Sequence, residues 1–205
     1  PWKDQGTVKF LCPAPGYDRH FAITERFGIE MLPVPMTGHG PDMDMVEALA
    51  QSDAAVKGMW CVPKYSNPTG ETYSEETVRR IASLRPAAPD FRVFWDMAYA
   101  LHDLDSTPDE LLNIFALTRG TENENLVLGF FSTSKITYAG AGVAMMISGA
   151  DNVKRARAEI AYQTISPDKM NQLRHARYLA CADNVRALMR RHASVLKPTF
   201  DTVTR

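Results

Sequence analysis

The chain has 205 residues, of which 45% are hydrophobic and 23% are charged. These proportions are typical of a globular protein of one or two domains, and a chain of this length buries about 70% of the surface of its unfolded form. The formal net charge of -1 gives no electrostatic reason to expect a nucleic acid or an anionic membrane as a partner. The apolar runs are far shorter than the roughly 20 residues that span a bilayer, so we do not expect this chain to be a membrane protein.

Short runs rich in β-branched and aromatic residues alternate with stretches of helical periodicity up to about residue 150. This alternation is typical of βα units, so we expect an α/β fold with a mostly parallel sheet flanked by helices. The expected strands are Thr7–Leu11, Glu30–Val34, Val56–Val62, Arg92–Trp95, Leu126–Phe131 and Val143–Ile147.

Several sites carry the residue types that begin helices, with a small polar cap followed by proline or acidic residues. They are Asp42 after Pro41, Ser74 before Glu75 and Glu76, the capping box Thr107-Pro108-Asp109-Glu110, and Ser166-Pro167-Asp168. Each of these sites predicts a helix that starts within one or two residues.

The pattern changes near residue 150, which predicts two parts, residues 1–150 and residues 151–205. In the second part, Asn152–Tyr162 and the stretch from Asp168 to about Thr204 have the pattern of long helices. Residues 151–205 hold 11 Lys and Arg against 5 Asp and Glu, a balance of +6, which leaves -7 for residues 1–150. The positive residues are spread among Leu, Ala and Met, as on a solvated helix face, so we expect no nucleic-acid site here.

The three cysteines, Cys12, Cys61 and Cys181, show no spacing that suits zinc or a disulfide framework, and we expect no metal site. The small number and wide separation of the cysteines favour a location in the reducing cytoplasm. Cys12 and Cys61 lie within apolar strand-like runs, so we expect inert, buried thiols. The chain begins with Pro1 and has no leader, from which we expect a fragment of a longer protein.

Polar or turn-forming residues follow four of the expected strands. Because ligands of open α/β sheets bind outside the carboxyl ends of the strands, we expect these segments to converge on one cleft. They are Cys12–His20, Pro63–Asn67, Asp96 and Ser132–Lys135.

Lys135 is the central candidate within this group. It follows Ser132-Thr-Ser and lies downstream of the Asn67-Pro68-Thr69-Gly70 turn and of the pair Asp96 and Tyr99. A lysine amine can hold a coenzyme aldehyde as a Schiff base, an aspartate can pair with a protonated pyridine nitrogen, and hydroxyls beside the lysine can bind phosphate. Each feature alone is more often a common turn, a helix cap or a surface lysine. Together they predict a site for pyridoxal 5'-phosphate.

In their order and spacing, these motifs from Pro15 to about Gly142 resemble the class I/II aminotransferases of the fold-type-I pyridoxal phosphate superfamily. A closer likeness is to the bacterial aspartate aminotransferase branch often labelled MocR-type. The segments that carry this likeness are Phe10–His20, Gly58–Gly70 and Ser132–Gly142. The resemblance implies that residues 1–150 are the coenzyme-binding portion of an incomplete large domain. It also implies that residues 151–205 are helices bridging toward a small domain that this chain lacks.

The resemblance implies a role for each motif residue. Lys135 would be the catalytic residue, binding the coenzyme and moving a proton between it and the substrate α-carbon. Asp96 would keep the pyridine nitrogen protonated, and His20 would hydrogen-bond to Asp96. Asn67 and Tyr99 would donate hydrogen bonds to the phenolic oxygen of the ring.

Tyr17 would stack on the coenzyme ring, and Ser132 and Ser134 would bind its phosphate. Two departures from the family pattern stand beside these matches. Val143 occupies the position where many relatives carry a phosphate-binding arginine. The upstream phosphate loop, the tyrosine from a partner subunit and the substrate-binding arginine have no counterparts in this chain, so we expect the chain alone to be inactive.

The resemblance implies an aminotransferase that moves an amino group between an amino acid, aspartate, and a 2-oxo acid, 2-oxoglutarate. It also implies a cytoplasmic homodimer. Two alternatives stay open at this point. One is a pyridoxal phosphate carbon-sulfur lyase, and the other is a coenzyme-binding domain of a transcription regulator that does not turn over a substrate.

Overall fold

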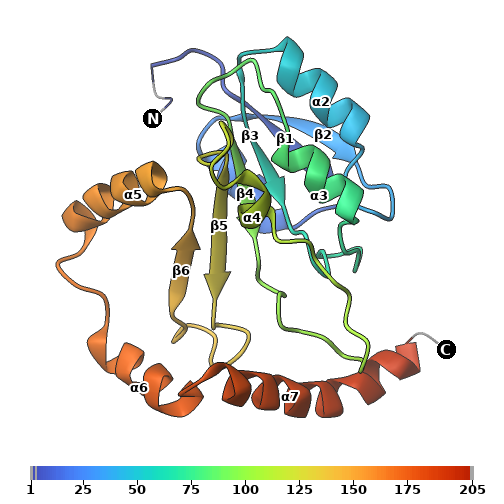
Figure 1. The fold of residues 1–205 in the computed structure, drawn as a ribbon, viewed down its shortest axis with the longest axis vertical. Helices are drawn as coiled ribbons and strands as arrows, with labels where there is room; N and C mark the ends of the chain where they lie inside the picture. Colours follow the sequence, from blue (N-terminus) through green and yellow to red (C-terminus); the bar gives the residue numbers. More distant parts are fainter. Residues whose placement is uncertain (1, 3, 204–205) are drawn as a thin grey trace.

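The computed structural model of the protein describes residues 2 and 4–203. Six strands form one sheet in the order β2-β1-β3-β4-β5-β6 (Figure 1). The strands are β1 (Lys9–Ala14), β2 (Glu30–Pro35), β3 (Val56–Cys61), β4 (Arg92–Asp96), β5 (Val127–Ser132) and β6 (Ala144–Ile147). All neighbouring pairs are parallel except β5 and β6, which are antiparallel. The expected mostly parallel α/β sheet is therefore confirmed.

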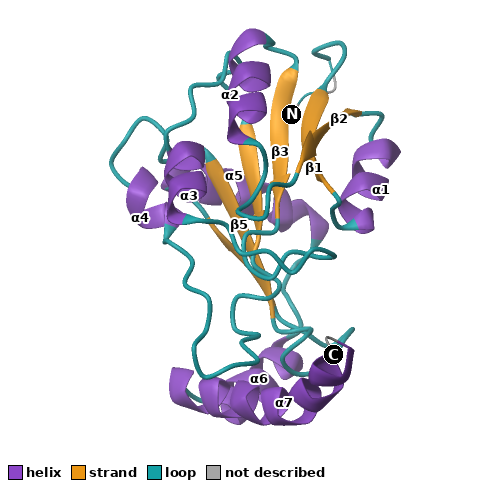
Figure 2. Cartoon of the chain, turned by 90° about the vertical axis from the view of Figure 1, so that its right-hand side faces the viewer, coloured by secondary structure: helices purple, strands orange, loops and turns teal. Residues whose placement is uncertain are grey.

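Helices cover both faces of this sheet, and a further group of helices lies beyond its end (Figures 1 and 2). They are α1 (Asp18–Arg26), α2 (Met43–Ser52), α3 (Glu75–Ala82), α4 (Ile114–Thr118), α5 (Ala150–Gln163), α6 (Lys169–Leu179) and α7 (Ala182–Val203). Figure 2 shows α2, α3 and α4 on one face and α1 on the other.

Alternating side chains of the strands build a core on each face. On β1, Leu11 packs into the core shared with α2, α3 and α4, whereas Phe10 and Cys12 pack on the α1 side. This is the period of two that a strand dictates. Gly58 on β3 makes room for the Phe10 ring, because a Cβ at this position would lie 2.5 Å from the ring atom Cζ. The sheet is thus held rigidly between two apolar layers.

Most of the expected helix starts are confirmed. Asp42 accepts a hydrogen bond from the Met45 amide at 3.1 Å, and Ser74 accepts one from the Thr77 amide at 3.1 Å. At the site Ser166-Pro167-Asp168, Asp168 is the cap and α6 begins one residue later.

The prediction of a helix that starts at Thr107 was wrong. The next helix, α4, begins at Ile114 and is capped by Asn113. The amide of Asp109 donates instead to the Tyr65 hydroxyl at 3.2 Å. Residues 105–110 are exposed, so a helix here would have no apolar face to bury. A tertiary contact therefore overrides the local capping signal.

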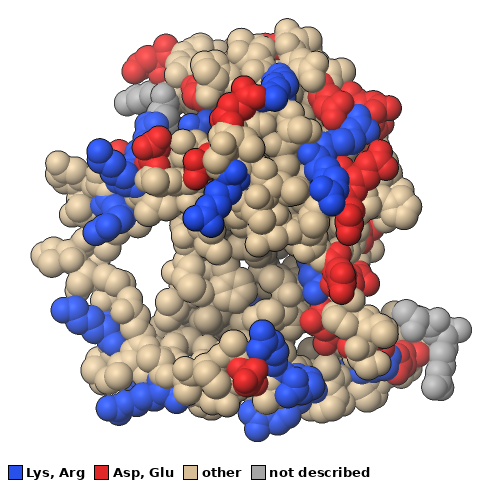
Figure 3. Space-filling model, viewed as in Figure 1, with Lys and Arg blue, Asp and Glu red and all other residues tan. Residues whose placement is uncertain are grey.

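The long helix expected from Asp168 to about Thr204 is divided into α6 and α7. Ala180 lies between them with φ of 52°, a left-handed conformation that interrupts the helix. Thr204 lies outside the described residues. Helices α6 and α7 form a layer past the carboxyl ends of the parallel strands, and basic side chains are spread over α5, α6 and α7 (Figures 1 and 3).

Cys12 and Cys61 are buried as expected, and burial raises the pKa of the Cys12 thiol to about 12. A thiol with so high a pKa is unreactive at neutral pH. Among residues 2 and 4–203, no helix has the combination of length and apolar character that crossing a bilayer requires.

Candidate active site

The parallel strands bring the predicted segments to one edge of the sheet. Strands β1, β3, β4 and β5 are neighbours that run in the same direction, so their carboxyl ends meet there. The segment with Tyr17 and His20 follows β1, and the segment with Asn67 follows β3. Asp96 is the last residue of β4 and pairs in register with Phe130 of β5, five residues before Lys135.

Asp96 is held at both carboxylate oxygens. Its Oδ2 lies 3.0 Å from Nε2 of His20, and its Oδ1 accepts a hydrogen bond from the Ala98 amide at 3.0 Å. His20 is buried, with 6% of its surface exposed, while a quarter of the Asp96 side chain is exposed. The carboxylate is therefore held in place by the buried His20 ring, and part of its surface remains accessible.

Trp60 supports His20 on the α1 face of the sheet. The two rings stack at 4.3 Å with an angle of 9° between their planes. The Trp60 indole N–H donates to the Thr24 hydroxyl at 2.8 Å, and that hydroxyl donates to the His20 carbonyl at 2.7 Å. These contacts fix both the ring and the main chain of His20.

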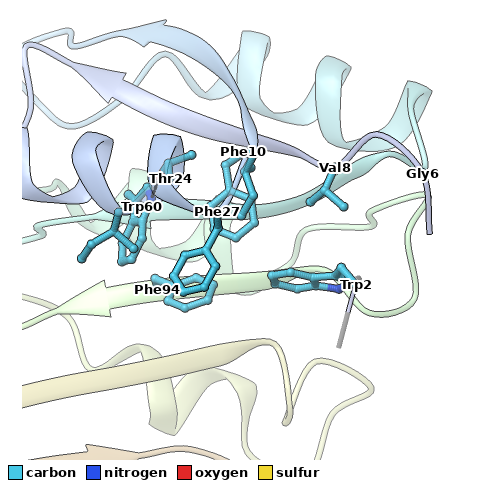
Figure 4. Close-up of a pocket in the computed structure, with 11 residues that line it drawn as sticks. Trp2, Gly6, Val8, Phe10, Thr24, Phe27, Trp60 and Phe94 are labelled. Atoms are coloured by element: carbon cyan, nitrogen blue, oxygen red, sulfur yellow. Dashed lines mark hydrogen bonds between the residues drawn. The ribbon is translucent and has the colours of Figure 1, made fainter. Parts of the chain in front are cut away.

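Trp60 also forms part of the wall of an apolar hollow of about 640 Å³ (Figure 4). Aromatic rings of Phe10, Phe27 and Phe94 line it as well, and none of its lining residues in the described part of the chain is charged. Neither Asp96 nor Lys135 reaches it. The hollow lies beside Trp60, the residue that supports His20, and its described lining lacks the charged groups that a reaction site would need.

The amine of Lys135 lies among the predicted aromatic residues. Its Nζ is 3.8 Å from the ring centroid of Tyr99 and 5.9 Å from that of Tyr17. The Tyr17 ring in turn meets the His20 ring edge-on at 5.2 Å. A chain of contacts thus joins Lys135 to His20, which holds Asp96.

The two predicted serines lie together in the loop that carries Lys135. The Ser132 hydroxyl donates to the Ser134 hydroxyl at 2.7 Å and accepts from the Ser134 amide at 3.0 Å. A Cβ on Gly142 would lie 2.4 Å from the Ser134 hydroxyl oxygen and 2.8 Å from its amide nitrogen. Only glycine at this position leaves the serine pair undisturbed.

Val143 closes the same loop through its main chain. Its amide donates to the Thr133 hydroxyl at 2.8 Å, and its carbonyl accepts from the Thr133 amide at 3.0 Å. Val143 is thus one end of a hydrogen-bonded loop.

Asn67 lies in a turn that Gly70 makes possible, with φ of +76° at Gly70 and a hydrogen bond from its amide to the Ser66 carbonyl at 2.6 Å. The Asn67 side chain is partly exposed. No hydrogen bond within the described part of the chain joins Asn67 to Asp96 or Lys135. Its place in the site stays a prediction.

An ion pair between a buried lysine and a partly exposed aspartate, which the sequence did not reveal, fixes this turn relative to the segment after Tyr99. The Lys64 amine donates to Asp103 Oδ1 at 2.5 Å, and the Tyr65 hydroxyl donates to the same oxygen at 2.9 Å. Lys64 is 8% exposed. Desolvation raises the pKa of Tyr65 to about 12, so the hydroxyl keeps its proton. Lys64 and Asp103 are 39 residues apart, and although Lys64 lies within the segment Pro63–Asn67, nothing in the sequence pairs it with Asp103.

We expect an Asp103→Asn variant to lower the free energy of unfolding by about 3 kcal/mol, because it leaves the buried Lys64 ammonium without its carboxylate. Denaturant unfolding of the full-length protein measures this change. Asp183→Asn is the matched control, since it makes the same change in an exposed pair with Arg186 and should cost about 0.5 kcal/mol or less. Equal losses in the two variants would argue against the importance of the pair of Lys64 and Asp103.

His102 is a second residue that sequence reasoning missed. Its Nε2 donates to the Lys135 carbonyl at 3.2 Å, and its ring meets the Tyr99 ring edge-on at 5.6 Å. Burial lowers the pKa of His102, which favours the neutral ring. His102 therefore contacts two predicted residues of the site, Lys135 and Tyr99.

Comparison with known proteins connects this geometry to a family. The family model described as "Aspartate amino-transferase" matches residues 1–205. A putative aminotransferase of Mycolicibacterium smegmatis is 52% identical over 203 residues, which are 99% of this chain and 47% of the relative. An aspartate aminotransferase of Corynebacterium glutamicum is 51% identical over 203 residues, with the same coverage of 99% and 47%. The chain thus spans about half the length of these curated relatives.

Solved structures agree with the fold. An aspartate transaminase from Corynebacterium glutamicum matches with a TM-score of 0.96 and 51% identity, over 100% of this chain and 48% of the other. A putative aminotransferase from Corynebacterium diphtheriae matches with a TM-score of 0.96 and 46% identity, over 100% and 50%. A kynurenine aminotransferase from Pyrococcus horikoshii, solved with PMP, has a TM-score of 0.80 at 20% identity, over 95% and 47%, and shows the fold alone. The expected incomplete aminotransferase fold is confirmed.

Proposed function

Because this chain belongs to the aspartate amino-transferase family, we propose that the full-length protein transfers an amino group from an amino acid to a 2-oxo acid with pyridoxal 5'-phosphate as coenzyme. We propose aspartate and 2-oxoglutarate as the substrates. The relative named aspartate aminotransferase, 51% identical to this chain, supports the first of these. The carrying observation is that Lys135, Tyr99, Tyr17, His20 and Asp96 form one connected group.

The residues of this group suit the chemical parts of the coenzyme. A free amine, a carboxylate backed by a buried histidine and two adjacent hydroxyls are the donor and acceptor types that an aldehyde, a pyridine nitrogen and a phosphate need. Gly142 leaves the serine hydroxyls open, since any side chain there would collide with Ser134. When bound, the coenzyme supplies an aldehyde for the lysine and an electron-accepting ring.

Asp96 and His20 act together on the pyridine nitrogen. The Asp96 carboxylate holds a proton at that nitrogen, because a fixed negative charge stabilises the protonated form. Since His20 is buried and stacked on Trp60, Asp96 cannot rotate away without losing a hydrogen bond. The His20 contact therefore keeps the negative charge of the Asp96 carboxylate in a fixed position.

Lys135 moves the proton at the substrate α-carbon. The face of the Tyr99 ring lies 3.8 Å from its Nζ and attracts the amine when it is protonated. Tyr99 thereby keeps the exposed lysine side chain close to the reacting carbon. We assign Tyr17 to the face of the coenzyme ring, Asn67 and Tyr99 to its phenolic oxygen, and Ser132 and Ser134 to its phosphate.

We also propose that the full-length protein is a cytoplasmic homodimer. In its support, the described residues leave much apolar surface uncovered in the part after β6. Tyr162 and Ile165 are fully exposed, and Tyr178 and Val195 are 61% and 74% exposed. Apolar surface of this extent is typical of faces that other chain segments or subunits cover.

The test is to reduce the coenzyme-loaded full-length protein with borohydride and to locate the adduct by peptide mass spectrometry. We expect the adduct on Lys135, because in the described residues it is the lysine whose amine lies over the rings of Tyr99 and Tyr17. An adduct on any other lysine, such as the ion-paired Lys64, would overturn the assignment.

Product analysis separates the proposed reaction from the two alternatives. A new amino acid formed from 2-oxoglutarate indicates transamination, whereas pyruvate and ammonia indicate carbon-sulfur lysis. A protein that carries the Lys135 adduct but turns over neither substrate class would be a coenzyme-binding regulator.

A further inference from the structure

We propose that His175 of α6 is a positioning residue for Lys135, because it hydrogen-bonds to the hydroxyls two residues before and two residues after the lysine. This inference rests on the proposed function of Lys135. The Nε2 atom of His175 lies 2.9 Å from the Thr133 hydroxyl and 2.9 Å from the Thr137 hydroxyl. A single ring nitrogen therefore lies within hydrogen-bond distance of hydroxyls on both sides of Lys135.

The turn between these hydroxyls leaves the main chain at Lys135 little conformational freedom. The amides of Ile136 and Thr137 both donate to the Thr133 carbonyl at 2.9 Å, which makes one tight turn around the lysine. Thr133 also binds both main-chain groups of Val143. The orientation of the turn as a whole thus decides the point and direction from which the Lys135 side chain leaves the main chain.

The other ring nitrogen of His175 determines which tautomer is present. Nδ1 lies 2.9 Å from the Asn171 carbonyl, which only accepts, so Nδ1 carries the proton. In the neutral ring Nε2 is then the acceptor. The Thr133 hydroxyl accepts from the Val143 amide, which leaves its own proton free for Nε2. The single lone pair of Nε2 therefore accepts from Thr133, whereas the one proton of the Thr137 hydroxyl has two acceptors within reach, Nε2 and the Thr133 carbonyl at 3.1 Å.

A second hydrogen bond joins the same helix to the far end of the loop. The Asn171 side-chain amide donates to the Ala141 carbonyl at 2.7 Å. Between the loop and helices α6 and α7 lies a hollow of about 870 Å³, lined by Ile136, Thr137, His175 and Leu188 among others. Since close packing is incomplete here, directional hydrogen bonds carry more of the positioning. Movement of α6 would therefore be transmitted to Lys135.

Three variants of His175 in the full-length protein test the proposal. His175→Gln places a carbonyl oxygen near the former Nε2 and keeps an acceptor for the two threonines. His175→Asn keeps a donor near the former Nδ1 but does not reach them, and His175→Ala removes both. We expect kcat to fall about 10-fold in the Asn and Ala variants, with substrate KM within about 2-fold of wild type and near-wild-type kcat in the Gln variant.

Hydrogen exchange of the coenzyme-free protein supplies a readout that does not depend on activity. We expect faster exchange at the amides of Ile136, Thr137 and Val143 in the Asn and Ala variants but not in the Gln variant. If His175→Ala does not fold, Thr137→Val against Thr137→Ser removes or keeps one hydroxyl and tests the same contact.

The outcomes distinguish this inference from the proposed function. A wild-type protein without a coenzyme adduct on Lys135 overturns the function. A wild-type protein with that adduct, together with unchanged kcat and exchange in His175→Ala, overturns the positioning role alone. A Gln variant as impaired as the Ala variant would also overturn it, since the contact to the threonines would then not be the important one.

Discussion

A Lys135→Ala variant of the full-length protein loses transamination activity by about 10⁴-fold, the upper range for loss of a group that transfers a proton in the transition state. Under the proposed function, the variant also lacks the amine to which the coenzyme would attach. The rate is measured in a single-turnover reaction, from the change in coenzyme absorbance after aspartate is added. Free substrate amine can still meet the coenzyme, so the loss should appear in the proton-transfer step.

Stability separates a chemical role from a structural one. The Lys135 side chain is exposed, so we expect the free energy of unfolding of Lys135→Ala to stay within about 0.5 kcal/mol of wild type. Lys154→Ala, which removes another exposed lysine on α5, should keep full activity. Retention of more than about a tenth of wild-type turnover by Lys135→Ala would exclude Lys135 as the catalytic lysine.

An Asp96→Asn variant is expected to reduce kcat/KM by about 10²- to 10³-fold. Asparagine keeps the size of the side chain and an oxygen for the Ala98 amide, but it removes the charge that favours a protonated pyridine nitrogen. Loss of one partner of a buried ion pair costs about 3–5 kcal/mol. The lower end applies here, because a quarter of the Asp96 side chain is exposed.

The matched control is Asp90→Asn, which removes the carboxylate partner of Lys57. Asp90 lies before β4 and Asp96 at its end, so the two variants alter the same strand at opposite ends. Asp90→Asn should lower stability and leave kcat/KM unchanged. If both variants reduce kcat/KM equally, the effect of Asp96 comes from the strand and not from its charge at the coenzyme.

The strands and most helix starts could be predicted because their signals are local. The alternation of Phe10, Leu11 and Cys12 between two apolar layers follows from the geometry of a strand. The caps at Asp42 and Ser74 satisfy amides three residues away. The Thr107 signal failed because the Asp109 amide found a partner 44 residues away, in Tyr65.

The candidate site likewise contains residues that local sequence signals reveal and residues that only long-range contacts reveal. By itself the sequence determined the candidates Lys135 and Asp96, the hydroxyls beside the lysine and the α/β sheet that carries them, because each is a short motif placed at the end of a strand. Only the tertiary structure decided which distant side chains meet near the site: His175 contacts the Lys135 turn, and Lys64 pairs with Asp103 beside the Asn67 turn. Along the chain these are ordinary polar residues, since a hydrogen bond or ion pair between residues some 40 positions apart depends on how the elements pack and leaves no periodic pattern in the sequence.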